Sequence, residues 1–249
     1  MGAWTKRRAD APLGVFVAEA AGLDWIRVEG GPPVPRVLEV TATSLRLERV
    51  VAAEPGADVA ADFGRRLAVL HTTAPGAYGA PWTGFIGPVD DLLPMDNATS
   101  PTWAEHFRER RVLPALRTAV DRAAIGPDDA AAVEQVLTLL EKLVPEEGPA
   151  RLHGDLWSGN VVWAADAAWL VDPAAHGGHR ETDLAMLALF GLPFLDVVLS
   201  AYDESQPLAD GWRERVGVHQ LWPLLVHAAL FGGSYGHRAG EAARTALSS

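Results

Sequence analysis

The stretch RLHGDLWSGNVVW, residues 151–163, decides how the rest of the chain is interpreted. It places His153, Asp155, Trp157 and Asn160 in one short irregular segment, between a polar turn and an apolar run. A carboxylate five residues before a carboxamide, with a β-like run behind them, is the layout of a loop that holds a metal ion and a base together. Because Asp, Ser, Gly and Asn all favour turns, a helix-capping turn is the alternative.

The residues after this loop favour a hairpin that brings a second carboxylate back to it. VVW, the turn AADAA and WLVD predict two strands within residues 161–172, so that Asp172 follows the hairpin. In phosphoryl transfer a loop Asp accepts the proton of the attacking hydroxyl, an Asn five residues later binds Mg²⁺, and an Asp beyond the hairpin binds the metal between phosphates. Asp155, Asn160 and Asp172 occupy these places in order, and oxygen donors suit Mg²⁺. The sequence therefore predicts a phosphotransferase site.

The N-terminal residues predict a small sheet that carries one helix. Strands are expected near residues 4–7, 36–40 and 44–50, and a helix at 16–28. Glu19 lies on the apolar face of this helix, where a carboxylate is costly unless a cation or donors meet it. Lys6 is the nearest candidate partner, and the alternative is that Glu19 lies at the edge of the face and reaches water.

Helices dominate the remainder of the chain. They are expected at residues 59–71, 103–120, 128–143, 181–190, 193–203, 212–231 and 236–247. Between them, residues 72–102 are rich in Gly, Pro, Asp and Thr and predict a long loop, with Trp82, Phe85 and Ile86 buried. The order predicts an α+β, two-lobed fold: a β-rich N-terminal lobe at residues 1–50, a helical lobe with the hairpin at 51–249, and a cleft between them.

Composition and charge exclude several other classes of protein. The formal charge of −11 argues against nucleic acid or an anionic membrane as the principal partner, and the absence of cysteine excludes disulfides and thiolate chemistry. The first residues have no apolar run typical of a secretory signal, and no segment approaches the roughly 18 apolar residues of a membrane span, so a cytoplasmic location is expected. His176 and His179 in HGGH suggest zinc, but without a third ligand in register we expect them to form loop hydrogen bonds.

Longer motifs resemble one family. LHGDLWSGN followed by LVDPAAHGGHRETDLAMLALFG is similar to the fructosamine kinases, also called ketosamine 3-kinases, which have a protein-kinase-like fold and are related to aminoglycoside phosphotransferases. The resemblance continues in FVAEAAGLDWI, FGRRLAVLHTT, GFIGPVDD, WAEHFRERRVLPAL and HQLWPLLVHAALFGGSYG, and so covers nearly the whole chain. HGD with a distal Asn is shared with aminoglycoside phosphotransferases and choline kinases, whereas the Trp157-Ser158 insert and GHRETDLAM are narrower.

The resemblance implies a role for each matching residue. Asp155 would be the proton acceptor, Asn160 and Asp172 would hold Mg²⁺, and Lys6, paired with Glu19, would contact the phosphates of ATP. The remaining implied residues are Glu48, Arg49 and Val50 at the hinge with adenine, Trp157 and His227 in the ketoamine pocket, His153 as an orienting residue, and Asp183 as an anchor of the loop. A plain core aromatic is the alternative for Trp157, and a satisfied core histidine is the better expectation for His227.

The implied reaction is transfer of the γ-phosphoryl group of ATP to the 3-hydroxyl of a ketoamine on a protein or small amine, whose product then sheds the sugar. Family members begin with two strands and a glycine-rich loop over the phosphates, whereas this chain opens almost at the strand that carries Lys6. The missing loop indicates either a truncated start or a catalytically impaired nucleotide-binding remnant. A kinase for another small alcohol, such as an aminoglycoside or choline, is a separate alternative. An exposed sheet edge would also permit oligomerisation. The preferred sugar and amine are left open.

Overall fold

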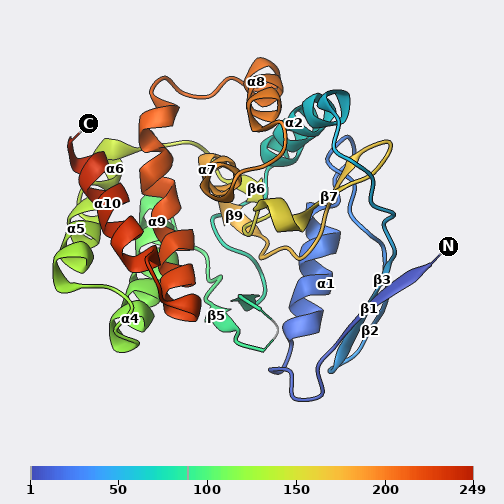
Figure 1. Cartoon of the computed structure of the whole chain (residues 1–249), viewed down its shortest axis with the longest axis horizontal. Coiled ribbons are helices and arrows are strands. Elements are labelled where there is room, and N and C mark those ends of the chain that lie inside the picture. The colour runs from blue at the N-terminus through green and yellow to red at the C-terminus, as the bar shows by residue number, and fades with distance from the viewer. Residues whose placement is uncertain (1, 89, 249) are drawn as a thin grey trace.

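The computed structural model describes residues 2–88 and 90–248. Near the N-terminus, a three-stranded antiparallel sheet of order β1-β3-β2 lies beside one helix (Figure 1). These elements are β1 (Ala3–Arg7), α1 (Val15–Ile26), β2 (Val37–Val40) and β3 (Ser44–Glu48). The helix buries Phe16, Leu23 and Ile26, and β3 buries Leu45 and Leu47 at alternate positions, as expected for a strand with one covered face. The sheet and helix predicted for this region are confirmed.

Helices and short strands make up the rest of the molecule. The helical elements are α2 (Ala57–Thr72), α3 (Trp103–Glu105), the π-helix η1 (His106–Val112), α4 (Leu113–Asp121), α5 (Pro127–Leu137), α6 (Leu140–Leu143), the 3-10 helix η2 (Ser158–Asn160), α7 (Glu181–Phe190), α8 (Leu195–Ser205), α9 (Trp212–Phe231) and α10 (Tyr235–Ser248). The strands pair as β4 (Gly84–Ile86) with β5 (Leu93–Met95), β6 (Ala150–Leu152) with β9 (His176–Gly178), and β7 (Val161–Trp163) with β8 (Ala168–Leu170). No helix in the described part of the chain has both the length and the apolar character needed to cross a membrane.

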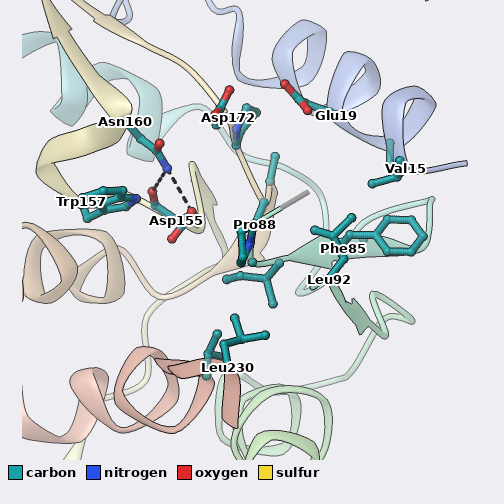
Figure 2. A pocket seen from close by; sticks show the side chains of 18 of the residues that line it. Val15, Glu19, Phe85, Pro88, Leu92, Asp155, Trp157, Asn160, Asp172 and Leu230 are labelled. Atoms are coloured by element: carbon teal, nitrogen blue, oxygen red, sulfur yellow. Dashed lines mark hydrogen bonds between the residues drawn. The ribbon is translucent and has the colours of Figure 1, made fainter. Parts of the chain in front are cut away.

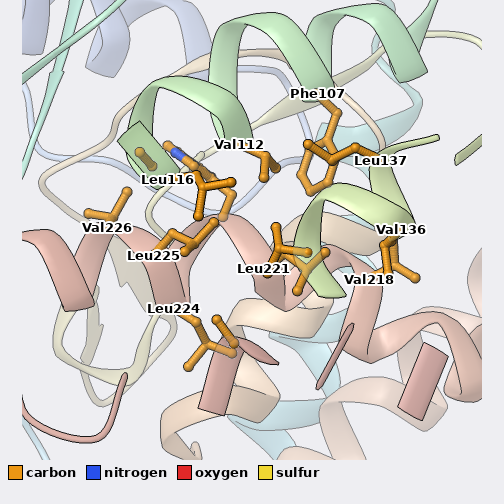
Figure 3. Close-up of a cluster of buried hydrophobic side chains, with 14 of the residues drawn as sticks. Phe107, Val112, Leu116, Val136, Leu137, Val218, Leu221, Leu224, Leu225 and Val226 are labelled. Atoms are coloured by element: carbon orange, nitrogen blue, oxygen red, sulfur yellow. The ribbon is translucent and has the colours of Figure 1, made fainter. Parts of the chain in front are cut away.

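Two hydrophobic clusters hold these elements. The first packs α4, α5, α9 and α10 around side chains such as Leu116, Val136, Leu221 and Leu225 (Figure 3). The second joins α1 and β3 to α2, α8 and the β7–β8 hairpin. Because full burial of one such side chain stabilises the fold by roughly 1.5–3 kcal/mol, the second cluster fixes the N-terminal sheet and the hairpin relative to each other.

The structure differs from the sequence-based expectations in three helical or loop segments. Residues 72–102 are not only loop, because β4 and β5 form a hairpin there; Ile86 is buried as expected, but Trp82 and Phe85 are half-buried. The helix expected at 103–120 contains a π-helical segment, and the helix expected at 128–143 ends at Leu137 before a separate turn of helix. The hairpin predicted after residue 160 is confirmed, with Val161 paired to Leu170.

Candidate active site

A cavity of about 310 Å³ contains most of the side chains that the sequence selected. It lies between α1, the loop after β6, the β4–β5 hairpin and α9 (Figure 2). Its charged and amide-bearing lining residues are Lys6, Glu19, Asp155, Asn160 and Asp172, and the rest of the lining includes Val15, Phe85, Leu92, Trp157, Val226, His227, Leu230 and Phe231. One end of the cavity is therefore charged and the other is apolar.

Asp155 lies at the base of the charged end. The Asn160 amide nitrogen donates to the Asp155 main-chain oxygen at 2.8 Å and to its carboxylate Oδ2 at 3.0 Å, bonds that the 3-10 turn at residues 158–160 makes possible. Burial raises the pKa of Asp155 to about 7, against the lowering effect of the Asn160 hydrogen bond. A carboxylate with this pKa can exchange a proton with a substrate hydroxyl near neutral pH.

A second carboxylate, on α7, fixes the backbone of this loop. Asp183 is buried and accepts hydrogen bonds from the amides of His153, at 2.7 Å, and Gly154, at 3.0 Å. The His153 ring nitrogen Nε2 lies 2.9 Å from the main-chain oxygen of Val171, one residue before Asp172. Gly154 has a φ of 81°, and a Cβ there would lie 2.2 Å from the oxygen of Ala174, so this position requires glycine. These contacts fix the backbone just before Asp155, and the roles of His153 and Asp183 as an orienting residue and an anchor stay predictions.

Asp172 has an unusual backbone conformation at the end of the hairpin. Its φ is 55°, in the left-handed region that residues other than glycine rarely adopt, and such strain is frequent at functional sites. The Val171 amide donates to the Asn160 main-chain oxygen at 3.1 Å, so the residues at 160 and 172 are held close together. The Asp172 side chain is 40% exposed and lines the cavity, which leaves it accessible to a ligand.

Lys6 links two carboxylates. Its Nζ lies 2.9 Å from Glu19 Oε1 and 2.5 Å from Asp172 Oδ1. The expected Lys6–Glu19 pair is thus confirmed, and Glu19 does not depend on water for its partner. Burial alone lowers the pKa of Lys6, but the two carboxylates outweigh this effect and raise it. Burial raises the pKa of Glu19, and Lys6 opposes that rise. The ammonium is therefore held by anionic side chains at the point where the cavity is most charged.

Aromatic side chains form part of the other end of the cavity. Trp157 is 38% exposed, with its ring edge-on to Phe190 at 6.1 Å, so it is not a plain core aromatic. His227 is half-buried, and its Nδ1 lies 2.7 Å from the main-chain oxygen of Pro223. Burial lowers the pKa of His227, so the ring is neutral at pH 7. Its ring also packs 5.4 Å from that of Phe231.

The crossing segment after β3 lies at a separate hollow. Glu48, Arg49 and Val50 border a space of about 270 Å³ together with the β7–β8 turn and Trp169, and none of these three lines the larger cavity. The amide of Ala53 donates to the main-chain oxygen of Trp163 at 2.8 Å, which joins the crossing segment to the hairpin. The structure thus separates the expected hinge residues from the charged end.

Several lining residues were missed in the sequence. The β4–β5 hairpin contributes Gly84, Phe85, Ile86, Gly87, Pro88 and Leu92, and α9 contributes Phe231, which is 56% exposed. The sequence signals for the hairpin were the length of the 72–102 segment, which is typical of functional loops, and the motif GFIGPVDD within the family resemblance. Phe231 is the last residue of α9, and nothing in its spacing along this apolar helix separates it from core residues.

The histidines of HGGH belong to buried contacts away from Asp155. The structure places His179 in a group of three possible metal ligands that the sequence did not reveal. Ligand atoms of His179, Glu181 and His219 lie within 4.8 Å of one another. Both oxygens of Glu181, however, accept hydrogen bonds from Arg215, at 2.6 and 3.0 Å. A carboxylate held by a buried guanidinium is a poor zinc ligand, and the geometry favours an ion-pair network.

Comparison with known proteins agrees with this geometry. The chain is 37% identical over 231 residues to a probable ketoamine kinase of Thermus thermophilus, covering 92% of this chain and 82% of the relative, and 33% identical over 239 residues to one of Synechocystis. A crystal structure from Thermobifida fusca that carries the name fructosamine-3-kinase has 50% identity and a TM-score of 0.93, and covers 99% of this chain and 86% of that one.

More distant structures share the fold alone. A thermostable aminoglycoside phosphotransferase bound to ADP and hygromycin B has 15% identity and a TM-score of 0.60, covering 98% of this chain and 85% of that one. The expected α+β, protein-kinase-like fold is thereby confirmed. The sequence model described as fructosamine kinase matches residues 4–249, and the chain belongs to the fructosamine kinase family.

Proposed function

We propose that this chain transfers the γ-phosphoryl group of ATP to the 3-hydroxyl of a ketoamine, a sugar joined through its ketone-bearing carbon chain to an amine. The observation that carries the proposal is the convergence of Asp155, Asn160 and Asp172 on one cavity, beside a lysine held by Glu19. Protein kinases and their relatives achieve phosphoryl transfer mainly by positioning and charge neutralisation, which are the functions that these residues can supply.

Asp155 would act on the acceptor. Its carboxylate accepts the proton of the 3-hydroxyl while that oxygen bonds to the γ-phosphorus, and the bond to the β-phosphate oxygen breaks to release ADP. The amide nitrogen of Asn160 donates a hydrogen bond to one oxygen of the Asp155 carboxylate, and this bond fixes the orientation of the carboxylate. Lys6 would neutralise charge on the phosphates of ATP.

The donor set near Asp172 fits magnesium. The amide oxygen of Asn160 and the exposed carboxylate of Asp172 are hard oxygen donors. The two hydrogen bonds of the Asn160 side chain are both donated by its amide nitrogen. When bound there, Mg²⁺ would supply positive charge to the phosphate oxygens. In the same arrangement, the backbone of Glu48, Arg49 and Val50 would meet the adenine at the second hollow.

The aromatic end of the cavity would receive the ketoamine, with Trp157 and His227 beside the sugar and its amine. Phosphate is a better leaving group than hydroxide, so the product would lose the phosphate at carbon 3 by β-elimination as inorganic phosphate. Water would then hydrolyse the remaining carbon–nitrogen bond and separate the sugar from the amine. Protein-bound ketoamines are the proposed substrates for this deglycation, and small ketoamines would enter the same cavity.

The test is incubation with ATP, Mg²⁺ and either a ribulosamine or a fructosamine, followed by ³¹P NMR of the product and a coupled assay for ADP. We expect a 3-phosphate on the ketoamine, turnover about 1000-fold slower in the Asp155→Asn variant, and unchanged turnover in Asp128→Asn, which alters an exposed carboxylate at the start of α5. An aminoglycoside and choline serve as competing acceptors. Preferential phosphorylation of either one, or ATP binding without transfer to any acceptor, would contradict the proposal.

A further inference from the structure

A buried arginine lies behind the cavity without a carboxylate partner. Arg111, in the π-helix η1, is 2% exposed, and among the described residues no Asp or Glu forms an ion pair with it. The nearby carboxylate of Asp96 pairs instead with Arg110. Burial lowers the pKa of Arg111 to about 9, which is still above neutral, so the guanidinium remains charged. A buried charge is costly unless its hydrogen bonds are satisfied, so its partners indicate its purpose.

One set of partners belongs to the segment that follows β5. Arg111 donates to the Asp96 main-chain oxygen at 2.8 Å and to the Asn97 side-chain oxygen at 2.5 Å. The main-chain oxygen of Asn97 in turn accepts from the amide of Ala80, at 2.9 Å, on the other side of the hairpin. Arg111 thus holds the base of the β4–β5 hairpin where both of its ends meet.

This hairpin is one wall of the cavity. Phe85, Pro88 and Leu92 of this segment line the cavity (Figure 2). Just before β4, Trp82 packs edge-on against Trp25 of α1, with ring centroids 5.7 Å apart. A shift of the hairpin base would therefore displace this wall of the cavity and disturb the helix that carries Glu19.

The other partner of Arg111 leads to the segment after Asp172. Its Nε donates to His176 Nε2 at 3.4 Å, and His176 Nδ1 donates to the main-chain oxygen of Ala174 at 2.9 Å. Burial holds the pKa of His176 well below its usual value, so the ring is neutral, with one nitrogen as donor and the other as acceptor. Ala174 lies two residues after Asp172 and lines the cavity.

The local sequence explains why the side chain at 111 is aimed inward. Pro114 has no N–H to donate to the main-chain oxygen of Arg110, four residues earlier, and the helix is π-helical at this point. The Arg111 guanidinium donates to that oxygen at 3.0 Å. Its planar group also lies over the Trp222 ring of α9, with its carbon 5.5 Å from the ring centre. A guanidinium has five donors in a fixed plane, whereas an ammonium cannot reach all these acceptors at once.

We propose that Arg111 is a positioning residue, which fixes the position of the β4–β5 wall of the cavity relative to the Asp172–Ala174 segment. The consequence for turnover rests on the proposed function, whereas the consequence for the backbone does not. Arg111 touches no lining group of the charged end directly, so its effect on catalysis is transmitted through Asn97 and His176.

The first experiment compares two arginines on the same helix. Arg108 donates to the Leu137 main-chain oxygen and to Glu141, far from the cavity, and so provides the matched control. We expect Arg111→Met to lower kcat at least tenfold in protein that is still folded, since misplacement by about 1 Å can cost 100-fold. The kcat of Arg111→Lys should fall by a similar factor, and the kcat of Arg108→Met should stay within about twofold of the wild-type value. Equal losses in the two Met variants, or wild-type kcat in folded Arg111→Met, would overturn the proposal.

The second experiment needs no turnover. The amides of Gly79 and Gly177 donate in the backbone bonds that join the hairpin base to β9, and the amide of Ala80 donates to Asn97 across the hairpin base, so hydrogen exchange at these three amides reports the position of the base. We expect faster exchange at these amides in Arg111→Met and in Asn97→Leu, and wild-type exchange in Asn97→Asp, which keeps an oxygen acceptor for the guanidinium. Unchanged exchange in Arg111→Met would refute the positioning role. If the wild-type chain had no kinase activity, the exchange result would still decide this inference, whereas the proposed function would fail on its own.

Discussion

Two groups of charged side chains lie inside this molecule, and they differ in whether a carboxylate oxygen stays accessible to a ligand. In the first, Lys6 bridges Glu19 and Asp172. In the second, Glu181 accepts two hydrogen bonds from Arg215 and lies 3.2 Å from His219 Nε2. Both groups join elements that are distant in the sequence, and both contain carboxylates removed from water.

The first group lines the cavity, whereas Glu181, Arg215 and His219 are buried and line neither of the two hollows described above. Asp172 is 40% exposed, has a left-handed backbone conformation, and lines the cavity together with Asp155. Burial by itself raises the pKa of Glu181, but His219 and Arg215 outweigh it and lower the pKa to about 2. A buried carboxylate is therefore no evidence for a site by itself. What distinguishes the first group is an accessible oxygen and the raised pKa of Asp155.

The largest expected effect is at Asp155. Asp155→Asn removes the proton acceptor while keeping the shape of the side chain, and we expect kcat to fall about 1000-fold, within the usual range for a lost general base. Steady-state kinetics with a ketoamine measure this, and unchanged hydrogen exchange confirms the fold. A loss smaller than tenfold would remove Asp155 from the reaction.

The second group should respond in stability instead. Glu181→Gln leaves Arg215 buried without its counter-charge, so we expect the free energy of unfolding to fall by about 3–5 kcal/mol. Urea denaturation measures the loss. At a temperature where the variant is folded, kcat per folded molecule should match the wild type. A selective loss of kcat would show that this network belongs to the catalytic machinery.

Lys6 should show both behaviours. Lys6→Met removes the cation that neutralises phosphate charge and leaves Glu19 without its partner, so we expect kcat/KM for ATP to fall about 100-fold, together with a loss of stability. Glu19→Gln, which keeps Lys6 but loses one of its carboxylates, should have the smaller kinetic effect. An unchanged KM and kcat for ATP in Lys6→Met would show that the lysine is only a structural partner.

The pH dependence of the reaction should follow Asp155. Because the base must be deprotonated and burial raises its pKa to about 7, kcat/KM for the ketoamine should fall tenfold per pH unit below about pH 7 and level off above it. Rates measured between pH 5 and 9 at saturating Mg²⁺ and ATP test this. A rate that stays constant down to pH 5 would place the pKa of Asp155 near its ordinary value.

The smallest expected effect is on the stability of the free protein. A carboxyl group whose pKa is higher in the folded state than in the unfolded state destabilises the fold as pH rises through the folded pKa. Asp155→Asn should therefore raise the free energy of unfolding by roughly 1–2 kcal/mol at pH 8, and by much less at pH 5. Urea titrations at the two pH values measure the difference, and equal effects at both would contradict the raised pKa.

Much of the fold could be predicted because its signals are local. The helix that carries Glu19, the helices after residue 180 and the hairpin after residue 160 follow from periodicity and turn residues. The strands β4, β5, β6 and β9 were not predicted, because β4 and β5 lie in a segment whose Gly, Pro and Asp content is typical of a loop, and because β6 pairs with β9, which is distant in the sequence. The division of the chain at residue 50 stays a prediction, as do the catalytic, metal and nucleotide roles of the residues named above.

The order and spacing of Asp155, Asn160 and Asp172 can be read from the sequence, because one turn and one hairpin are enough to bring the three residues together. Long-range packing is needed to explain why Lys6 is shared between two carboxylates, why the pKa of Asp155 rises to about 7, and why Arg111 supports the cavity wall. These properties depend on desolvation and on distances of a few ångströms between distant segments, and the packing of the two hydrophobic clusters sets both.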